Sequence, residues 1–324
     1  MRALVTGGTG FVGGHLAEAL VRRGVQVTAL VRSPGKASLL QQLKVRQISG
    51  DLHNHEALRA AVRDQEVVYH VAGLVAARDE SEFLRANRDA TANLLRAIAD
   101  VAGPRPRFVL VSSMAAGGPA PRGKPLRGDE PASPVTQYGR SKLAGEAEVR
   151  AADLPWTIVR PPMVYGPRDA EVLKVFKLAR AGFAAVFGDG SQELSAVYGP
   201  DLAEALVAAG TGARTEGRVY YACHPEIFRS VDLVHRIGIA LGRRVRVVPL
   251  PDWVGRGALS VTGLAARLTG QATILTSDKA NEFFQPAWIG DPGPFIEDTG
   301  WRPAHDLTSG LAATAEWYRE QGWL

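Results

Sequence analysis

The chain has 324 residues, of which 46% are hydrophobic and 22% are charged, and its formal net charge is +5. Such a length holds one large α/β domain, or a large domain with a smaller partner, and the composition is ordinary for a soluble globular protein. The sequence predicts no membrane span, because no apolar run reaches the length that crosses a bilayer. The basic residues are spread along the chain, so we expect no nucleic-acid binding.

Cysteine and histidine usage narrows the possible sites further. Cys223 is the only cysteine, so no disulfide within the chain is possible. His53 and His55 lie close together, but no carboxylate or thiolate cluster completes a metal-binding set, and we expect no metal. After Met1 the apolar residues are soon interrupted by Thr6 and two glycines, unlike a signal peptide. We therefore expect a cytoplasmic protein.

Strands and helices alternate through the first half of the chain. This alternation predicts a Rossmann-type, doubly wound parallel sheet, because each helix crosses over the sheet to reach the next parallel strand. Right-handed crossovers place the carboxyl ends of the strands along one edge, where ligands bind near the topological switch point. The predicted strands are residues 2–6, 25–31, 45–48, 66–71, 107–112 and 157–160, and the predicted helices are residues 11–23, 56–63, 89–102 and 136–152.

The second half of the chain has a less regular pattern. We expect residues 1–165 to form a dinucleotide-binding domain and residues 166–324 to form mainly a smaller C-terminal substrate-binding lobe, with about 195–210 returning to the first domain. Residues 182–190 are rich in glycine and alanine, and residues 251–300 in glycine, proline and aromatic residues, without a clear periodicity. Helices are predicted at residues 203–209, 231–242 and 311–320, and strands at residues 218–222 and 245–249.

A glycine-rich turn joins the first predicted strand to the first predicted helix. Gly7 permits the tight turn, Gly10 lets the backbone approach a pyrophosphate, and Gly13 lets the helix pack closely on the strand. The helix that begins at Phe11 and Val12 offers free N–H groups and a positive dipole to the anion. This spacing in a strand–turn–helix context predicts a bound dinucleotide.

The end of the second predicted strand bears on which dinucleotide binds. An acidic residue there would hydrogen-bond the ribose 2′-hydroxyl and favour NAD. This chain instead has Val31 followed by Arg32, with Lys36 nearby, and a cation at that place pairs with a 2′-phosphate. We therefore favour NADP(H), with NAD(H) possible and a merely solvated arginine as the alternative interpretation.

Tyr138 and Lys142 are four residues apart, on one face of a predicted helix. A free phenol titrates near pH 10 and is a poor base at neutral pH, whereas a neighbouring ammonium stabilises the phenolate. A general acid or base works best when its pKa lies near the working pH. The pair is common by chance, so its meaning depends on the motifs around it.

Further short motifs accompany this pair in a fixed order. They are Gly50-Asp51-Leu52, His70-Val71-Ala72-Gly73, Asn87 in ANRDATANLLRA, Val111-Ser112-Ser113, the segment from Arg160-Pro161-Pro162 through Val164-Tyr165-Gly166-Pro167, and Thr299-Gly300-Trp301-Arg302-Pro303. With the glycine turn, their order and spacing resemble the extended short-chain dehydrogenase/reductases. That family includes sugar-nucleotide epimerases and dehydratases, 3β-hydroxysteroid dehydrogenases and dihydroflavonol reductases. The resemblance covers nearly the whole chain.

The resemblance implies the roles of the site residues. Ser113 would hold the substrate oxygen against the Tyr138 phenol, with Ser112 as the competing assignment. Tyr138 would give or take the proton, while Lys142 lowers its pKa and contacts the nicotinamide ribose. The cofactor would carry the hydride. The resemblance further implies that the cofactor is contacted by Asp51 (at the adenine), Leu52, Ala72, Gly73, Asn87, Ser112, Pro161 and Val164.

Departures from the sugar-nucleotide enzymes bear on the substrate. Leu194 stands where those enzymes often carry the arginine that grips a diphosphate, although Arg160 or Arg168 remain candidates for that role. Met114 and Ala115 follow Ser113 where a dehydratase would carry an acidic pair. Apolar and aromatic residues fill three later segments, which would line a lipophilic pocket or equally form core or a dimer face. The segments are residues 183–187, 253–268 and 283–288.

The function expected from these residues is hydride transfer between a nicotinamide cofactor and a secondary alcohol or ketone. A lipophilic, steroid- or flavonoid-like substrate is favoured. The first alternative is an NAD-retaining sugar-nucleotide epimerase, which would need a cationic diphosphate clamp. The second is a non-catalytic dinucleotide-binding sensor or assembly subunit, which would have a degraded Ser/Tyr/Lys set. The resemblance also implies a homodimer formed through a helix pair that includes the Tyr/Lys helix.

Overall fold

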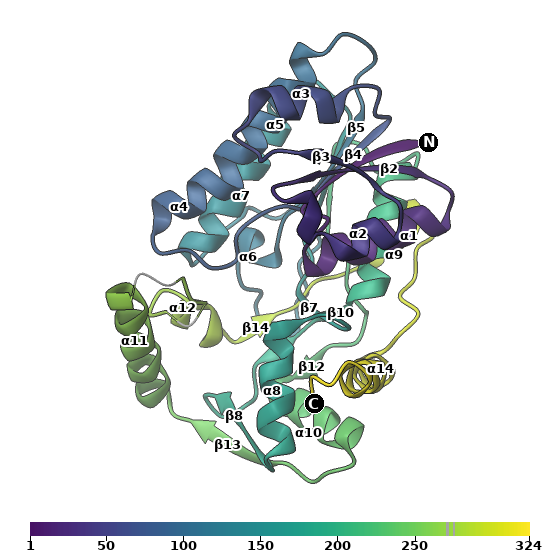
Figure 1. The fold of residues 1–324 in the computed structure, drawn as a ribbon. Helices are drawn as coiled ribbons and strands as arrows, with labels where there is room; N and C mark the ends of the chain where they lie inside the picture. Colours follow the sequence, from purple (N-terminus) through teal and green to yellow (C-terminus); the bar gives the residue numbers. More distant parts are fainter. Residues whose placement is uncertain (270–271, 275) are drawn as a thin grey trace.

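A seven-stranded parallel sheet forms the upper half of the protein in the view of Figure 1. This computed structural model describes residues 1–269, 272–274 and 276–324, without the side chains of Lys36 and residues 264–268. The strand order is β11-β6-β5-β4-β1-β2-β3, so the order reverses between β1 and β4. The strands are β1 (Arg2–Thr6), β2 (Gln26–Val31), β3 (Arg46–Ser49), β4 (Val67–His70), β5 (Arg107–Val111), β6 (Trp156–Val159) and β11 (Arg218–Tyr220).

Helices cover both faces of this sheet, which explains its nearly continuous apolar strands. In β1, Ala3 and Val5 pack into one core cluster, whereas Leu4 packs into a second cluster on the other face. The first cluster includes α1 (Phe11–Arg22), α2 (Ser38–Gln42) and α9 (Gly199–Thr211). The second includes α3 (His55–Val62), α5 (Ala90–Asp100) and α7 (Gln137–Arg150). The predicted fold class is therefore confirmed.

The predicted helix at residues 89–102 differs in its beginning. A short helix, α4 (Glu80–Leu84), runs into a π-helical turn at Arg85–Asp89, and α5 follows it without a break. Such turns often occur at functional sites. Asn87 lies within this turn, so an expected helix start is an irregular segment that carries a site residue.

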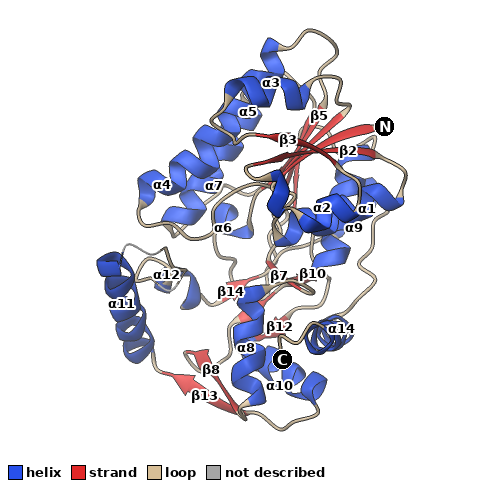
Figure 2. Ribbon diagram, viewed as in Figure 1, coloured by secondary structure: helices blue, strands red, loops and turns tan. Residues whose placement is uncertain are grey.

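The lobe has its own core below the sheet. Phe176, Ile237, Leu311 and Tyr318 pack there with residues of two short paired strands, β7 (Met163–Tyr165) and β10 (Ala196–Tyr198). Figure 2 shows its helices on the side of the molecule away from β1–β3. They are α8 (Ala170–Arg180), α10 (Ser230–Leu241) and α14 (Leu307–Glu320). The boundary expected at residue 165 remains a prediction.

Two segments that lacked a clear pattern contain regular structure. Residues 182–190 contain β8 (Phe183–Phe187), which pairs in parallel with β13 (Arg246–Leu250). Residues 251–300 contain helix α11 (Asp252–Thr269). The remaining short elements are α6 (Met114–Gly117), β9 (Glu193–Leu194), β12 (Phe228–Arg229), α12 (Ala280–Phe283), β14 (Ala287–Trp288) and α13 (Gly293–Thr299).

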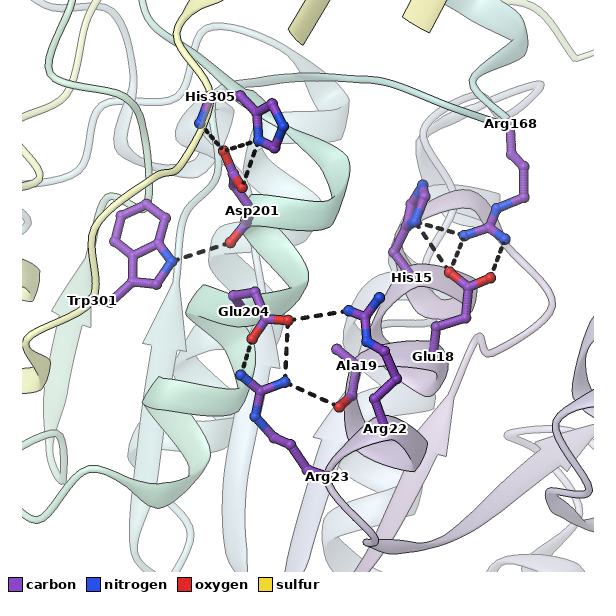
Figure 3. A network of polar contacts seen from close by, with 10 residues as sticks. All are labelled: His15, Glu18, Ala19, Arg22, Arg23, Arg168, Asp201, Glu204, Trp301 and His305. Atoms are coloured by element: carbon purple, nitrogen blue, oxygen red, sulfur yellow. Dashed lines mark hydrogen bonds and ion pairs between the residues drawn. The ribbon is translucent and has the colours of Figure 1, made fainter. Parts of the chain in front are cut away.

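Ion pairs and hydrogen bonds fasten α9 to α1 and to the C-terminal segment (Figure 3). Glu204 on α9 accepts hydrogen bonds from Arg22 and Arg23 at the end of α1. Asp201, one turn earlier, accepts the Trp301 indole N–H at 3.2 Å through its backbone carbonyl and the His305 backbone N–H at 2.8 Å through its carboxylate. The helix that follows the glycine turn is thereby fixed against the sheet.

Candidate active site

The glycine turn has the shape that a pyrophosphate requires. Gly7 has a φ of +73°, which favours glycine, and its carbonyl oxygen accepts the Gly10 N–H at 2.9 Å. A side chain at Gly13 would place its Cβ only 2.1 Å from that oxygen. Helix α1 begins at Phe11 with no side-chain cap, and Phe11 and Val12 are half-buried. Its first N–H groups are therefore available to an anion, and the turn fits a dinucleotide.

The residues expected at the adenosine end lie after β2 and β3. Arg32 directly follows β2 and is exposed, whereas the Lys36 side chain lies outside the described part of the chain. Asp51 is exposed and accepts the His53 backbone N–H at 2.8 Å. Leu52 is half-buried beside it. Arg32 is thus accessible to a phosphate next to the glycine turn, and Asp51 is accessible to a base.

A buried chain of hydrogen bonds connects the ends of β1 and β4 to α5. The Ala72 N–H donates to the Thr6 hydroxyl at 3.3 Å, and that hydroxyl lies 2.7 Å from His70 Nδ1. His70 Nε2 lies 3.0 Å from the Thr91 hydroxyl, which donates to the Asn87 carbonyl at 2.7 Å. Burial lowers the pKa of His70 to about 3, so the ring is neutral. This chain holds the Ala72 backbone in place beside the glycine turn.

The Asn87 side chain joins the loop after β4 to the catalytic helix. Its Oδ1 accepts the Leu74 N–H at 3.0 Å, and its Nδ2 donates to the Leu74 carbonyl at 3.1 Å and to the Ser141 hydroxyl at 2.9 Å. Ser141 donates in turn to the Tyr138 carbonyl at 2.8 Å. Any Cβ on Gly73 would lie 2.7 Å from Asn87 Oδ1. Asn87 therefore positions the backbone on both sides of the site.

Ser113, Tyr138 and Lys142 converge at the carboxyl end of β5. Ser113 follows β5 and caps α6, and its hydroxyl lies close enough to the Tyr138 phenol to lower the pKa of that phenol. Tyr138 lies in the first turn of α7. Lys142, one turn later, is buried and donates from Nζ to the Val111 carbonyl at 2.8 Å. The structure thus brings together the three residues predicted to be catalytic.

Burial governs the ionisation of both catalytic groups. It raises the pKa of Tyr138 to about 12, a rise that the Ser113 hydrogen bond opposes and the Glu282 charge reinforces. Burial also lowers the pKa of Lys142 to about 8, although the Glu146 carboxylate opposes that change. The pKa of Tyr138 is therefore raised where a lowering by Lys142 was expected, and Lys142 is not among the causes of the shift. At neutral pH the phenol keeps its proton and most of Lys142 is charged, which suits proton donation to a carbonyl oxygen.

Ser112 has a different environment from its neighbour. Its hydroxyl donates to the buried Glu146 carboxylate at 2.6 Å. The same carboxylate receives Arg160 Nε at 2.8 Å and Nη2 at 2.7 Å, and Arg160 is only 2% exposed. This internal ion pair ties α7 to the end of β6. Because the Ser112 hydroxyl is bound to this ion pair, Ser113 is favoured over Ser112 as the catalytic serine. The Arg160 guanidinium is likewise occupied inside the protein.

The segment expected beside the nicotinamide follows β6 at the same sheet edge. The Pro161 carbonyl accepts the Met114 N–H at 2.9 Å, which joins this segment to the start of α6. Val164 is half-buried in β7 and pairs with Val197 of β10. Pro161 is thus anchored near the end of β5, where Ser113 lies.

Three residues from the lobe contact the start of α7, and sequence patterns did not indicate them. They are Asp278, Lys279 and Glu282. Thr136 caps α7, its hydroxyl accepting the Gly139 N–H at 3.1 Å and donating to Glu282 at 2.6 Å. Asp278 accepts the Gln137 N–H at 2.9 Å. A threonine before a helix is a recognisable capping signal, but nothing local indicates its acidic partners.

Lys279 is the third of these residues. Its ammonium lies 5.5 Å from the centroid of the Tyr138 ring and forms an ion pair with Glu282. A cation over an aromatic face is attracted to the ring electrons. Phe83 packs on the same ring, with centroids 5.9 Å apart. The lobe therefore places both charge and apolar surface around the phenol.

The two arginines considered for a diphosphate clamp are both engaged elsewhere. Arg168 lies in a left-handed backbone conformation with a φ of +73° and donates both ends of its guanidinium to Glu18 on α1, at 2.8 and 2.7 Å (Figure 3). It also approaches His15. Arg160 is paired with Glu146, and Leu194 is half-buried in β9. The ion pairs leave neither guanidinium free to form the clamp that a sugar-nucleotide epimerase requires.

A metal-binding cluster and a membrane-spanning helix are both absent from the described residues. Within residues 1–269, 272–274 and 276–324, no three His, Cys, Asp or Glu side chains gather closely enough to hold a metal ion. No helix in the same ranges is both long and apolar enough to cross a membrane.

Similarity to known proteins agrees with this geometry. Residues 3–223 match the NAD dependent epimerase/dehydratase family. The chain is 33% identical to a ceramide reductase of Caulobacter vibrioides, over 99% of this chain and 95% of that protein. It is 31% identical to a 2-alkyl-3-oxoalkanoate reductase of Stenotrophomonas maltophilia, over 96% and 97%. A UDP-glucuronic acid 4-epimerase of Bacillus cereus, solved with UDP-glucuronic acid and NAD, has the same fold, with a TM-score of 0.79, 21% identity and coverage of 99% and 100%.

Proposed function

The chain belongs to the NAD dependent epimerase/dehydratase family and is an NAD(P)-dependent oxidoreductase, and we propose that it reduces a lipophilic ketone with NADPH. One observation carries the proposal. The Ser113 hydroxyl and a protonated, half-buried Tyr138 phenol lie close together beside the sheet edge at which the glycine turn lies. A carbonyl oxygen that bonds both hydroxyls would receive its proton directly from Tyr138.

The roles of the residues follow from their contacts. Ser113 orients the carbonyl oxygen, and Tyr138 supplies the proton as the carbonyl carbon accepts hydride. Lys142 provides positive charge at the end of β5, where the proton leaves the phenol. The nicotinamide, when bound, supplies the hydride. The protein itself contributes position and electrostatics, because Asn87 and Thr136 fix both ends of the helical turn that carries Tyr138.

The preference for NADP(H) over NAD(H) rests on Arg32. Its exposed guanidinium follows β2, where no carboxylate stands to bind a ribose 2′-hydroxyl. We propose that Arg32 pairs with the 2′-phosphate and that Asp51, Leu52, Ala72, Gly73, Pro161 and Val164 line the rest of the cofactor site. The Asn87 and Ser112 side chains act on the protein frame of that site.

The lipophilic substrate is favoured by the lobe and by the relatives. Phe187 stacks on Phe283 with ring centroids 4.6 Å apart, and Phe284 meets Phe187 edge-on at 5.5 Å. Phe283 and Phe284 closely follow Lys279, whose ammonium lies over the Tyr138 ring. Two relatives are named as a ceramide reductase and a 2-alkyl-3-oxoalkanoate reductase. The sugar-nucleotide epimerase remains the second candidate because of its shared fold, although Arg160 and Arg168 are both held in ion pairs.

The location of the enzyme and its oligomeric state are also part of the proposal. We place the enzyme in the cytoplasm, and we propose a homodimer formed through a helix pair that includes α7. Light scattering on the purified full chain tests the second point, because a monomeric mass at all concentrations would contradict it.

The experiment that tests the function begins with the cofactor. The purified protein is denatured and any released dinucleotide is identified by mass spectrometry, while cofactor-free protein is titrated with NADPH and NADH. NADPH oxidation is then followed with 3-oxo esters of increasing chain length. We expect an exchangeable site that prefers NADPH and a kcat/KM that rises with chain length. Stoichiometric, tightly held NAD together with turnover of a UDP-sugar would overturn the proposal.

A further inference from the structure

The two strands β8 and β13 form a small sheet with one covered face. Ala184, Val186 and Val234 pack into a core on the inner side. Because side chains alternate along a strand, every second one points away from that core. On this outer side Phe183 is 47% exposed and Val248 is 36% exposed. Phe183 and Val248 lie on the same face, because Phe183 pairs with Arg246 and Val248 pairs with Ala185. The outer face therefore carries apolar side chains in solvent.

Helix α11 extends this apolar surface. Its buried positions, Gly255, Leu259 and Gly263, follow a helical spacing, whereas Trp253 is 79% exposed and Val261 68% exposed. Figure 2 shows α11 leading away from the end of β13 along the side of the lobe. An exposed tryptophan on an amphipathic helix is typical of a surface that meets the polar–apolar boundary of a membrane.

Positive charge surrounds these apolar residues. Arg243 donates to the Arg180 carbonyl at 2.7 Å, and the Arg246 backbone N–H donates to the Gly182 carbonyl at 2.9 Å, so these arginines adjoin Phe183. Among the ion pairs of the described residues, none includes Arg180, Arg243, Arg244 or Arg246, although all four are exposed. Asp189 and Asp252, which follow β8 and β13, are exposed acidic residues. We call the exposed group the basic–apolar rim: Arg180, Phe183, Arg243, Arg246, Val248 and Trp253.

The rim is connected to Tyr138 by a series of contacts, of which the first is aromatic and the later ones are charged. Phe187 ends the strand that begins at Phe183, and it stacks on Phe283. Phe283 belongs to α12, as does Glu282, the ion-pair partner of Lys279. The Lys279 ammonium in turn lies over the Tyr138 ring. These contacts connect the rim, residue by residue, to the side chains that surround the phenol.

We propose that the basic–apolar rim docks on a lipid surface that contains anionic headgroups, and that the enzyme takes its ketone from that surface. The inference rests on the proposed function, because only a lipophilic substrate would reside there. Arginine guanidinium groups attract anionic headgroups, while Phe183, Val248 and Trp253 enter the apolar boundary below them. A second copy of the chain is a less suitable occupant, because the unpaired arginines would face one another across a two-fold axis.

Vesicle flotation tests docking without reference to catalysis. The full chain is mixed with vesicles of phosphatidylcholine alone or with added phosphatidylglycerol. We expect binding only with phosphatidylglycerol, and weaker binding as salt is raised. Arg243→Gln with Arg246→Gln should lower the partition constant by about fivefold for each charge removed. Trp253→Ser should lower it by about tenfold. The matched control, Arg59→Gln with Arg63→Gln, removes two exposed arginines from the α3 end and should leave binding unchanged.

Activity assays separate this proposal from the proposed function. On a short, water-soluble ketone the rim variants should keep the wild-type kcat/KM, whereas on a long-chain ketone carried in phosphatidylglycerol vesicles they should lose activity in proportion to binding. The docking proposal is overturned if the wild-type protein does not bind vesicles that contain phosphatidylglycerol. So do rim variants that only dissociate a dimer, or that raise the KM for a dissolved long-chain ketone without changing vesicle binding. Failure of the wild type to reduce any ketone overturns the proposed function instead, whatever the flotation result.

Discussion

The sheet half and the lobe contribute to the same active site through different kinds of contact. In the sheet half the glycine turn, the β4 loop and the Ser113 cap all sit at strand ends, where parallel pairing holds them in register. In the lobe, Asp278, Lys279 and Glu282 reach α7 from the far end of the chain, through side chains alone. The sheet half therefore determines that a carbonyl is reduced, whereas the lobe determines what surrounds that carbonyl.

This difference predicts a division of mutational effects. Changes at the sheet edge should abolish or redirect chemistry on every substrate, because they remove the proton or the cofactor. Changes in the lobe should alter pH dependence or substrate preference while the chemistry persists. The four predictions below test this division, beginning with the largest effect.

Among the changes tested in the sheet half, Tyr138→Phe should have the largest effect on activity. The phenylalanine keeps the ring that packs on Phe83 but removes the proton donor. We expect kcat to fall by about 10²–10⁴-fold with every ketone, because that is the usual contribution of a general acid. The dissociation constant for NADPH, measured by fluorescence titration, should stay nearly unchanged. Retained turnover in this variant would show that the proton comes from another group.

Arg32→Ala should affect the cofactor without touching the chemistry. Loss of a charged hydrogen bond to a phosphate should raise the NADPH dissociation constant by about 10–100-fold, while the NADH constant hardly changes. Arg46→Ala is the matched control, since Arg46 is an exposed arginine at the first position of β3. Equal losses for both cofactors would contradict recognition of the 2′-phosphate and place Arg32 elsewhere in binding.

The same division explains what could be predicted from the sequence. The strands of the parallel sheet read as apolar runs because both of their faces are buried, and β1 has the predicted bounds. Helix α11 escaped prediction because its buried stripe consists of Gly255, Leu259 and Gly263, while Trp253 and Val261 point to solvent. Its hydrophobic pattern is therefore misleading about which face is inside.

Lys279 escaped prediction for a different reason. Its contact with Tyr138 joins residues far apart in the chain, across an irregular stretch rich in glycine and proline. No local periodicity records such a contact. The proximity of Ser113, Tyr138 and Lys142, by contrast, is predictable, because Tyr138 and Lys142 share one helix face and Ser113 follows the neighbouring strand β5.

The pH dependence of ketone reduction should be determined by Lys142, a residue of the sheet half. The reactive form needs a charged Lys142, and burial lowers the pKa of that lysine to about 8. Its protonated fraction therefore falls tenfold for each pH unit above that value. Tyr138, with a pKa of about 12, keeps its proton over the same range. We expect kcat/KM for reduction to be level near neutrality and to decline above about pH 8. A profile that stays level to pH 10 would remove Lys142 from this role.

Lys279→Met tests the lobe, and its effect should be the smallest. The variant removes the cation over the Tyr138 ring and leaves the Glu282 carboxylate, whose charge already raises the pKa of the phenol. The phenolate becomes harder to form, so the rise of alcohol oxidation with pH should move upward by about half a pH unit, as expected for a cation–π contact. Lys279→Arg should restore the wild-type profile.

The control for this variant comes from the same lobe. Lys174 and Glu171 form an ion pair with the same three-residue spacing on α8, where the pair is exposed. Lys174→Met should leave the oxidation profile unchanged. If Lys174→Met and Lys279→Met shift the profile equally, the effect is a general loss of positive charge. If Lys279→Met lowers kcat as severely as Tyr138→Phe does, the lobe takes part in the chemistry itself, and the two halves cannot be separated as their contacts indicate.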